Sequence, residues 1–93
     1  MECENLIFSG HAVQRMFYRR ITKDEIQSVI VYGEIIEEYP NDEPFPCYLL
    51  FDYVKGQPIH VVLAKDEKTG TCYVVTAYIP DPQVWQDDFK SRR

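Results

Sequence analysis

Residues 21–39 read ITKDEIQSVIVYGEIIEEY, and within this stretch the hydrophobic pattern changes from a helical to a strand period. Thr22 and Glu25 have the spacing of a capping box, so a helix is expected to begin here. Gly33 is expected to end this helix as a residue in the left-handed conformation. The run 34–39 that follows is short and β-rich, and it is predicted to form a strand. The stretch therefore predicts that helical structure gives way to a sheet at Gly33.

A first helix is predicted upstream, over residues 10–19, because Ser9 is a favourable N-cap. Several apolar residues share one side of this helix at helical spacing, and that side is expected to face the core. These residues are Ala12, Val13, Met16 and Phe17. Two helices are thus expected before any strand.

Downstream of Tyr39, three further β-rich runs are separated by short turn segments. The last segment, 80–93, is predicted to form a turn and a short helix from which Trp85 and Phe89 dock on the sheet. The prediction is a single α+β domain over residues 1–93, with two N-terminal helices, a four-stranded antiparallel sheet and a short C-terminal helix. The three additional strands are expected in CYLLFDY (47–53), PIHVVLAK (58–65) and TCYVVTAY (71–78).

The formal net charge of −5 argues against a protein that coats nucleic acid with its whole surface, which requires a broad basic face. The charges are nevertheless segregated along the chain. Acids dominate residues 34–43, whereas Arg15, Arg19 and Arg20 lie in a stretch without a single acid. A local basic site therefore remains compatible with the composition, and the acidic strand is expected either to discourage aggregation or to meet a basic partner.

The three cysteines are odd in number, widely separated and without a CxxC pair, so we expect neither a disulfide framework nor a zinc site. Buried or idle thiols in a reducing cytoplasm are the predicted state. No apolar run approaches the roughly 20 residues of a membrane helix, and no signal peptide pattern is present. No metal or nucleotide-cofactor motif is found either, so no cofactor is predicted.

A helical wheel of residues 11–20 places His11, Arg15, Arg19, Ala12 and Met16 in that order around one arc. The basic side chains thus border the side expected to be buried instead of lying opposite it. One interpretation is a solvated helix face with paired charges. The other is a helix edge that holds guanidinium groups over a cleft while their aliphatic stems pack on apolar neighbours.

His60 lies within an apolar strand, where a histidine is more often a satisfied core residue than a catalyst. If the first helix crosses the sheet near this strand, His11 and His60 meet in one cleft beside Arg15 and Arg19. Histidine suits proton transfer near neutral pH, and arginine pairs with phosphate oxygens through its planar fork. Such a group would suit RNA cleavage, with a base for the 2′-hydroxyl, an acid for the leaving oxygen and guanidinium groups for the phosphate.

Thr76 and Tyr78 share one face of the last predicted strand. Their hydroxyls are placed either to bond a phosphate or simply to face water on the open side of the sheet. Arg92 belongs to a second basic group at the C-terminus, where charged and mobile residues are common.

The motif HAxxRMxxRxI over residues 11–21 combines length with uncommon residue types. Together with GEIIEEYP, HVVLA, TAYIPDPQVW and the closing DDFKSRR, it resembles the bacterial family called domain of unknown function 4258. Members of that family look like small toxins of the RelE-like, barnase-related ribonuclease superfamily. The resemblance implies an endoribonuclease held inactive by a zinc-finger antitoxin protein. Carried over to this chain, it marks His11, Arg15, Arg19, His60, Thr76, Tyr78 and Arg92.

The leading hypothesis from the sequence is a metal-independent endoribonuclease toxin of a type II toxin–antitoxin system. In it, His11 and His60 are the catalytic acid and base, while Arg15 and Arg19 bind the phosphate with Thr76, Tyr78 and Arg92. A different class of function is a non-catalytic interaction module that contacts a partner protein. A third is a small-molecule sensor that uses a cleft near His60. Catalysis by two histidines requires His11, Arg15 and His60 to converge in one pocket, which the fold decides.

Overall fold

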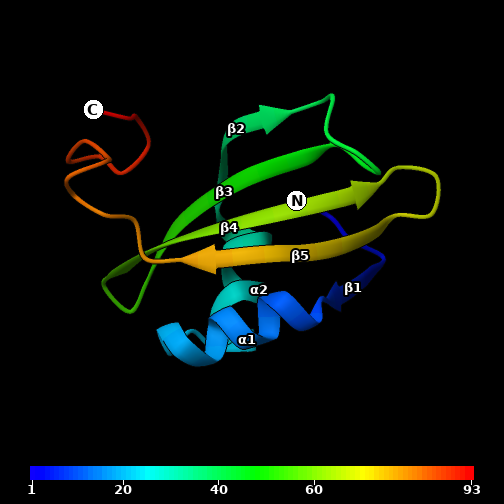
Figure 1. Cartoon of the computed structure of the whole chain (residues 1–93), viewed down its shortest axis with the longest axis horizontal. Coiled ribbons are helices and arrows are strands. Elements are labelled where there is room, and N and C mark those ends of the chain that lie inside the picture. Colours follow the sequence, from blue (N-terminus) through cyan, green and yellow to red (C-terminus); the bar gives the residue numbers. More distant parts are fainter.

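The computed structural model describes residues 1–93 and places two helices on one face of a five-stranded sheet (Figure 1). The α+β class is confirmed, but the predicted four-stranded antiparallel sheet and C-terminal helix are wrong. In chain order the elements are β1 (Asn5–Phe8), α1 (Gly10–Arg19), α2 (Lys23–Tyr32), β2 (Glu34–Tyr39), β3 (Cys47–Val54), β4 (Gln57–Asp66) and β5 (Thr71–Tyr78).

The sheet differs from the predicted one because a short strand, β1, precedes the helices. The strand order is β1-β5-β4-β3-β2, and β1 runs parallel to β5 while the other neighbours are antiparallel. Asn5 pairs with Thr71 and Phe8 with Val74 at the edge of the sheet (Figure 1). Four residues are too few for a hydrophobic alternation to stand out, and a parallel partner lies far along the chain. Both facts conceal β1 in the sequence.

The two helices begin where their capping signals predict. Ser9 Oγ accepts a hydrogen bond from the Ala12 amide at 3.0 Å at the start of α1. In α2 the Thr22 hydroxyl accepts from the Glu25 amide at 3.1 Å, and the Glu25 carboxylate accepts from the Thr22 amide at 2.8 Å. These caps satisfy amide groups that the first turn of a helix otherwise leaves unpaired. Neither helix is long and apolar enough to cross a membrane.

Gly33 ends α2 as predicted, but for a different physical reason. Its φ of −75° is an ordinary extended value, so the expected left-handed conformation is wrong. A Cβ atom at this position would lie 2.4 Å from the Val29 carbonyl oxygen and 2.7 Å from that of Phe51. Gly33 is therefore required because the backbone of α2 approaches β3 too closely for a side chain.

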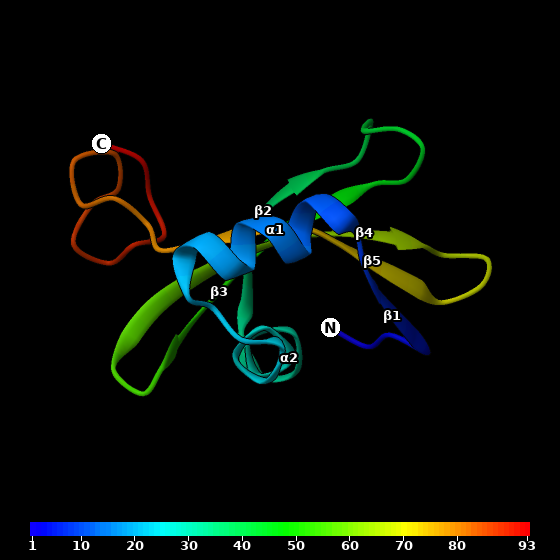
Figure 2. The same cartoon turned by 60° about the horizontal axis from the view of Figure 1, so that its bottom comes forward.

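The core lies between the helices and one face of the sheet. Figure 2 shows α1 lengthwise and α2 nearly end-on, so the two helices cross this face in different directions. The predicted inward side of α1 is only half right, because Ala12 and Met16 are buried whereas Val13 is 44% and Phe17 82% exposed. A narrow stripe of α1 is enough to cover β5, since α2 covers β3 and β4. The other residues of this core are Ile21, Ile26, Val29, Ile30, Leu50, Ile59, Val61, Leu63, Cys72, Val74 and Ala77.

The C-terminal segment, residues 79–93, forms a loop on the opposite face of the sheet, at the upper left of Figure 1. The docking of Trp85 and Phe89 is confirmed, because both contact side chains of the sheet. Asp88 explains why no helix forms here, since its carboxylate accepts hydrogen bonds from the amides of Lys90 and Ser91. Such local bonds offer the backbone an alternative to helical pairing.

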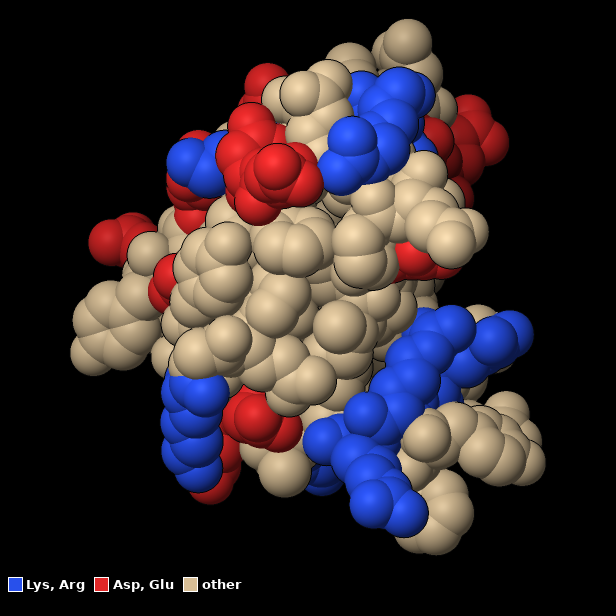
Figure 3. Space-filling view, turned by 90° about the vertical axis from the view of Figure 1, so that its left-hand side faces the viewer, with Lys and Arg blue, Asp and Glu red and all other residues tan.

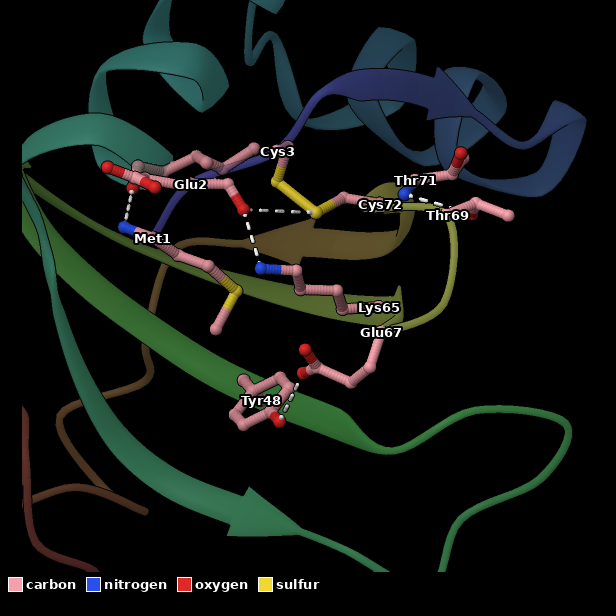
Figure 4. The surroundings of a disulfide bond; sticks show 10 residues. Met1, Glu2, Cys3, Tyr48, Lys65, Glu67, Thr69, Thr71 and Cys72 are labelled. Atoms are coloured by element: carbon pink, nitrogen blue, oxygen red, sulfur yellow. Dashed lines mark hydrogen bonds between the residues drawn. A yellow bond between two sulfur atoms is a disulfide. The ribbon is translucent and has the colours of Figure 1, made fainter.

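The expectation that all three cysteines are free thiols is wrong. Cys3 and Cys72 form a disulfide that ties the segment before β1 to β5 (Figure 4). In the same view Lys65 donates a hydrogen bond from Nζ to the Glu2 carbonyl at 2.8 Å. Cys47 remains free and buried, and burial raises the pKa of its thiol. Pairing across 69 residues could not be read from the sequence, because it depends on the parallel position of β1.

Candidate functional site

The sheet face that the helices leave open carries polar side chains from several strands. The register pairs Tyr78 of β5 with His60 of β4, and Thr76 with Val62. Cross-strand partners point to the same face, so Thr76, Tyr78 and His60 all belong to the open face. The predicted sharing of one face by Thr76 and Tyr78 thus agrees with the register.

Arg19 reaches this face around the edge of β5. Because β1 pairs with β5 only as far as Val74, the rest of β5 has no strand on its outer side. Arg19, in the last turn of α1, donates from Nη1 to the Ala77 carbonyl at 2.7 Å and to Thr76 Oγ1 at 3.3 Å. The guanidinium group therefore occupies the unpaired strand edge, where its position is fixed by the packing of α1 on β5.

Arg92 approaches the same face from the C-terminal loop. Its Nη2 donates to Glu37 Oε1 of β2 at 3.1 Å, and the Tyr39 hydroxyl donates to the same oxygen at 3.1 Å. The guanidinium group also lies over the Trp85 ring, at 4.5 Å from its centroid. Burial, together with the Glu37 carboxylate, raises the pKa of Tyr39. These contacts hold Arg92 above the sheet instead of leaving it as a mobile end.

A β-bulge arranges the acidic partners of the C-terminal loop. The register of β2 on β3 shifts between Ile35 and Glu37, so that Glu34 and Glu37 face the same side although they are three residues apart. Glu34 pairs with Lys90 at 2.7 Å, as Glu37 does with Arg92. The basic partner expected for the acidic strand is therefore the C-terminus of the same chain.

His60 lies beneath this loop and is fully buried. Its Nε2 is 2.7 Å from the Phe89 carbonyl oxygen, which can only accept, so Nε2 carries the proton. Nδ1 then accepts from the Tyr78 hydroxyl at 3.2 Å. Burial lowers the pKa of His60, and it raises the pKa of Tyr78. The neutral ring is thus held with its one free nitrogen directed at Tyr78.

These elements enclose a hollow of about 550 Å³, which we call the arginine pocket. It brings together three residues that the sequence marked, Arg19, Tyr78 and Arg92. Its remaining lining residues are Ile79, Asp81, Val84 and Trp85. Two guanidinium groups and a phenol in one hollow form a site that suits an anion with several oxygen atoms.

The structure does not bring the two histidines together. His11 is exposed in the first turn of α1, on the helical side of the molecule, and His60 is buried on the other side of the sheet. His11 is also eight residues before Arg19, or about 12 Å along the helix. Arg15 is exposed and does not line the arginine pocket. The predicted convergence of His11, Arg15 and His60 is therefore absent.

A second and larger hollow, of about 790 Å³, lies beside the disulfide. It is lined by residues 1–4, 65 and 67–70 together with Val31, and contains neither an arginine nor an aromatic side chain. The structure also has no group of three or more histidine, cysteine, aspartate or glutamate residues placed to hold a metal ion. The arginine pocket is accordingly the candidate site.

Three residues around the pocket were missed as site residues in the sequence, namely Glu37, Tyr39 and Trp85. Period-two alternation in EIIEEY places Glu37 and Tyr39 on one face, so that pair could have been found. The position of Trp85 over His60, with ring centroids 4.5 Å apart, follows from the path of the loop and has no such signal.

A family model described as Domain of unknown function (DUF4258) matches residues 8–79 of the chain. The chain belongs to this family. The DUF4258 match includes the HAxxRMxxRxI motif and all of β5, but it ends before Trp85 and Arg92. No curated protein and no solved structure matches the chain.

Proposed function

We propose that the arginine pocket binds the phosphodiester backbone of RNA, and that the protein cleaves it without a metal ion by attack of the 2′-hydroxyl. The observation that carries the proposal is the meeting of Arg19, Arg92 and Tyr78 in one hollow. Guanidinium groups bind phosphate oxygens through paired hydrogen bonds and stabilise the charge that grows on them during displacement at phosphorus. The formal net charge of −5 argues against RNA binding over the whole surface, so the proposed contact with RNA is local to this pocket.

His60 takes part only through Tyr78, because its buried ring cannot touch the substrate. In the proposed step the 2′-hydroxyl gives its proton to Tyr78 Oη, while the Tyr78 proton moves to His60 Nδ1. A bond forms between the 2′-oxygen and phosphorus, and the bond from phosphorus to the 5′-oxygen breaks. The 5′-oxygen takes a proton from water, and the products are a 2′,3′-cyclic phosphate and a 5′-hydroxyl. His60 is thus a positioning residue and proton acceptor for Tyr78.

This proposal keeps the RNA substrate and Arg19, Arg92 and Tyr78 of the sequence hypothesis, but Arg15 lies outside the pocket. Tyr78 and His60 replace the pair of histidines. The resemblance to RelE-like toxins adds a biological setting, in which a zinc-finger antitoxin protein blocks the pocket. We propose in addition that the activity occurs in the cytoplasm, where RNA is accessible. Expression in bacteria is then expected to arrest growth in wild type and not in Tyr78→Phe.

The test is cleavage of a labelled single-stranded RNA in the presence of a chelator, with the products analysed for cyclic phosphate. Tyr78→Phe is expected to lower the rate by about 100-fold, a typical contribution of one proton-transfer group. Tyr53→Phe is the matched control, because Tyr53 is a 51%-exposed tyrosine on the same sheet that does not line the pocket. Intact RNA at stoichiometric protein, or equal rates for Tyr78→Phe and wild type, would refute the proposal.

A second candidate function is a non-catalytic interaction module that contacts a partner protein at the same surface. The ion pair between Arg92 and Glu37 favours it, because this guanidinium group is already neutralised by a carboxylate. The cleavage assay separates the two candidates. An interaction module leaves the RNA intact and releases no cyclic phosphate.

A further inference from the structure

Two aromatic rings stand exposed at the end of α1. Phe17 is 82% and Tyr18 75% exposed, and their ring centroids lie 6.3 Å apart with the rings edge to face. The core uses only Ala12 and Met16 from this helix, so the stability of the fold does not explain these rings. Two adjacent aromatic side chains with such large exposed fractions indicate a surface that a ligand covers.

The neighbours of these rings are basic. The stretch 5–23 contains no acid, and Arg15 lies one turn before Tyr18 on the same side of the helix. The side chains of His11 and Arg15 have no hydrogen bond or ion pair within the chain, unlike Arg92. In Figure 3 the basic side chains at the lower right are bordered by uncharged ones, whereas those at the top mix with acidic groups.

The basic residues of α1 form a row that extends along the helix from Arg19, away from the arginine pocket. His11, Arg15 and Arg19 are separated by four residues each, which is about 6 Å along a helix axis. Successive phosphates of an extended single strand have a similar separation. A strand with one phosphate at Arg19 therefore has its next phosphates near Arg15 and His11, and Tyr18 lies beside them.

We propose that the outer surface of α1 is a subsite for unpaired RNA, in which Arg15 and His11 contact successive phosphates and a base stacks on Tyr18. The inference rests on the proposed function, since it extends the strand bound in the arginine pocket. It specifies single-stranded RNA as the substrate class, because only unpaired bases expose a face to an aromatic ring. Phe17 lies edge to face with Tyr18 and adds a second exposed ring to this surface.

An acidic segment of a partner protein is the competing occupant of this surface. The row of basic groups favours RNA, because it continues from the pocket at the spacing of a phosphate backbone. A protein partner requires no such regular spacing. Competition between a poly-glutamate peptide and RNA belongs in the test for this reason.

The experiment measures binding of a labelled 2′-O-methyl oligonucleotide, which cannot be cleaved by 2′-hydroxyl attack. Tyr18→Ala is expected to raise the dissociation constant about 10-fold, as the loss of one stacked base does, and Tyr18→Trp to restore the affinity. Arg15→Ala is expected to reduce the slope of log affinity against log salt by about 0.7. Tyr32→Ala is the matched control, since Tyr32 is a 79%-exposed tyrosine on α2, and it is expected to bind as wild type does.

The result that overturns the subsite is equal affinity of Tyr18→Ala and Tyr32→Ala, or equal binding of a duplex with the same sequence. Tyr18-dependent binding of the poly-glutamate peptide, with no binding of the oligonucleotide, overturns it in favour of a protein partner. Tyr78→Phe distinguishes this subsite from the proposed reaction, because that variant is expected to lose cleavage, whereas adding Tyr18→Ala to it is still expected to raise the dissociation constant about 10-fold. If Tyr78→Phe cleaves RNA normally while Tyr18→Ala binds weakly, the reaction fails and the subsite stands.

Discussion

Replacing His60 by alanine tests whether this residue joins the C-terminal loop to the sheet. The imidazole makes hydrogen bonds to the Phe89 carbonyl and the Tyr78 hydroxyl, worth about 1 kcal/mol each. It also packs edge-on against Phe51, Tyr78 and Trp85. Removing a buried ring typically costs about 3–5 kcal/mol in total, so we expect a loss of about 4 kcal/mol in the free energy of unfolding.

Equilibrium unfolding in urea measures this loss with two probes. Trp85 is the only tryptophan of the chain and lies against His60, so its fluorescence reports the C-terminal loop. Far-ultraviolet circular dichroism reports the helices and the sheet. His60→Gln is the matched comparison, because its amide nitrogen can still donate to the Phe89 carbonyl, and we expect it to lose about 2 kcal/mol.

The pH dependence of the free energy of unfolding provides a second test of the role of His60. Burial lowers the pKa of folded His60 below the ordinary histidine value of about 6.5, so the unfolded chain takes up this proton first as the pH falls. The contribution of neutral His60 to the free energy of unfolding is fully present above about pH 6.5. It is lost as the pH falls from there toward the pKa of folded His60. His60→Gln is expected to lack this part of the acid destabilisation. A loss below about 1 kcal/mol in His60→Ala, or identical pH profiles for wild type and His60→Gln, would contradict the assigned role.

Three further predictions concern the fold. Replacement of Cys3 and Cys72 by serine is expected to lower the free energy of unfolding by about 4 kcal/mol in the chain-entropy model. Wild type is expected to be destabilised by dithiothreitol, and the serine variant is not. An unfolding midpoint of wild type that dithiothreitol leaves unchanged would contradict the disulfide. Gly33→Ala is expected to destabilise the protein by about 1–3 kcal/mol in thermal unfolding, because its Cβ would overlap the carbonyl of Phe51, and a variant as stable as wild type would exclude that close approach. Thr22→Ala removes the helix cap and is expected to cost about 1 kcal/mol, whereas Thr22→Ser should behave as wild type.

Local signals in the sequence were sufficient for both helices and for four of the five strands. A capping residue interacts with residues three or four positions away, so Ser9 and Thr22 predict the starts of their helices without reference to the rest of the chain. Strand alternation in β5 likewise placed Thr76 and Tyr78 on one face. By the same reasoning, the helical period alone ordered Arg15 and Arg19 along one edge of α1.

The candidate site was predictable only in part, because its residues come from segments that the sequence cannot relate. Arg19 and Tyr78, which the sequence marked, line one pocket, and the wheel explains why Arg19 borders the buried side. The pairing of His11 with His60 required α1 to cross the open face of the sheet. The helix lies on the other face, so a residue on α1 can reach the site only around the edge of β5, as Arg19 does.

The sequence by itself determined both helices, four of the five strands and the shared face of Thr76 and Tyr78, because those features depend on neighbours within a few positions. Only the tertiary structure decided the parallel strand β1, the disulfide between Cys3 and Cys72, and the loop that lays Arg92 over the sheet. The first two features join the N-terminal residues to β5, and the third joins the C-terminal residues to β2. Their stability comes from contacts that exist only after the sheet has assembled, which is why no local pattern records them.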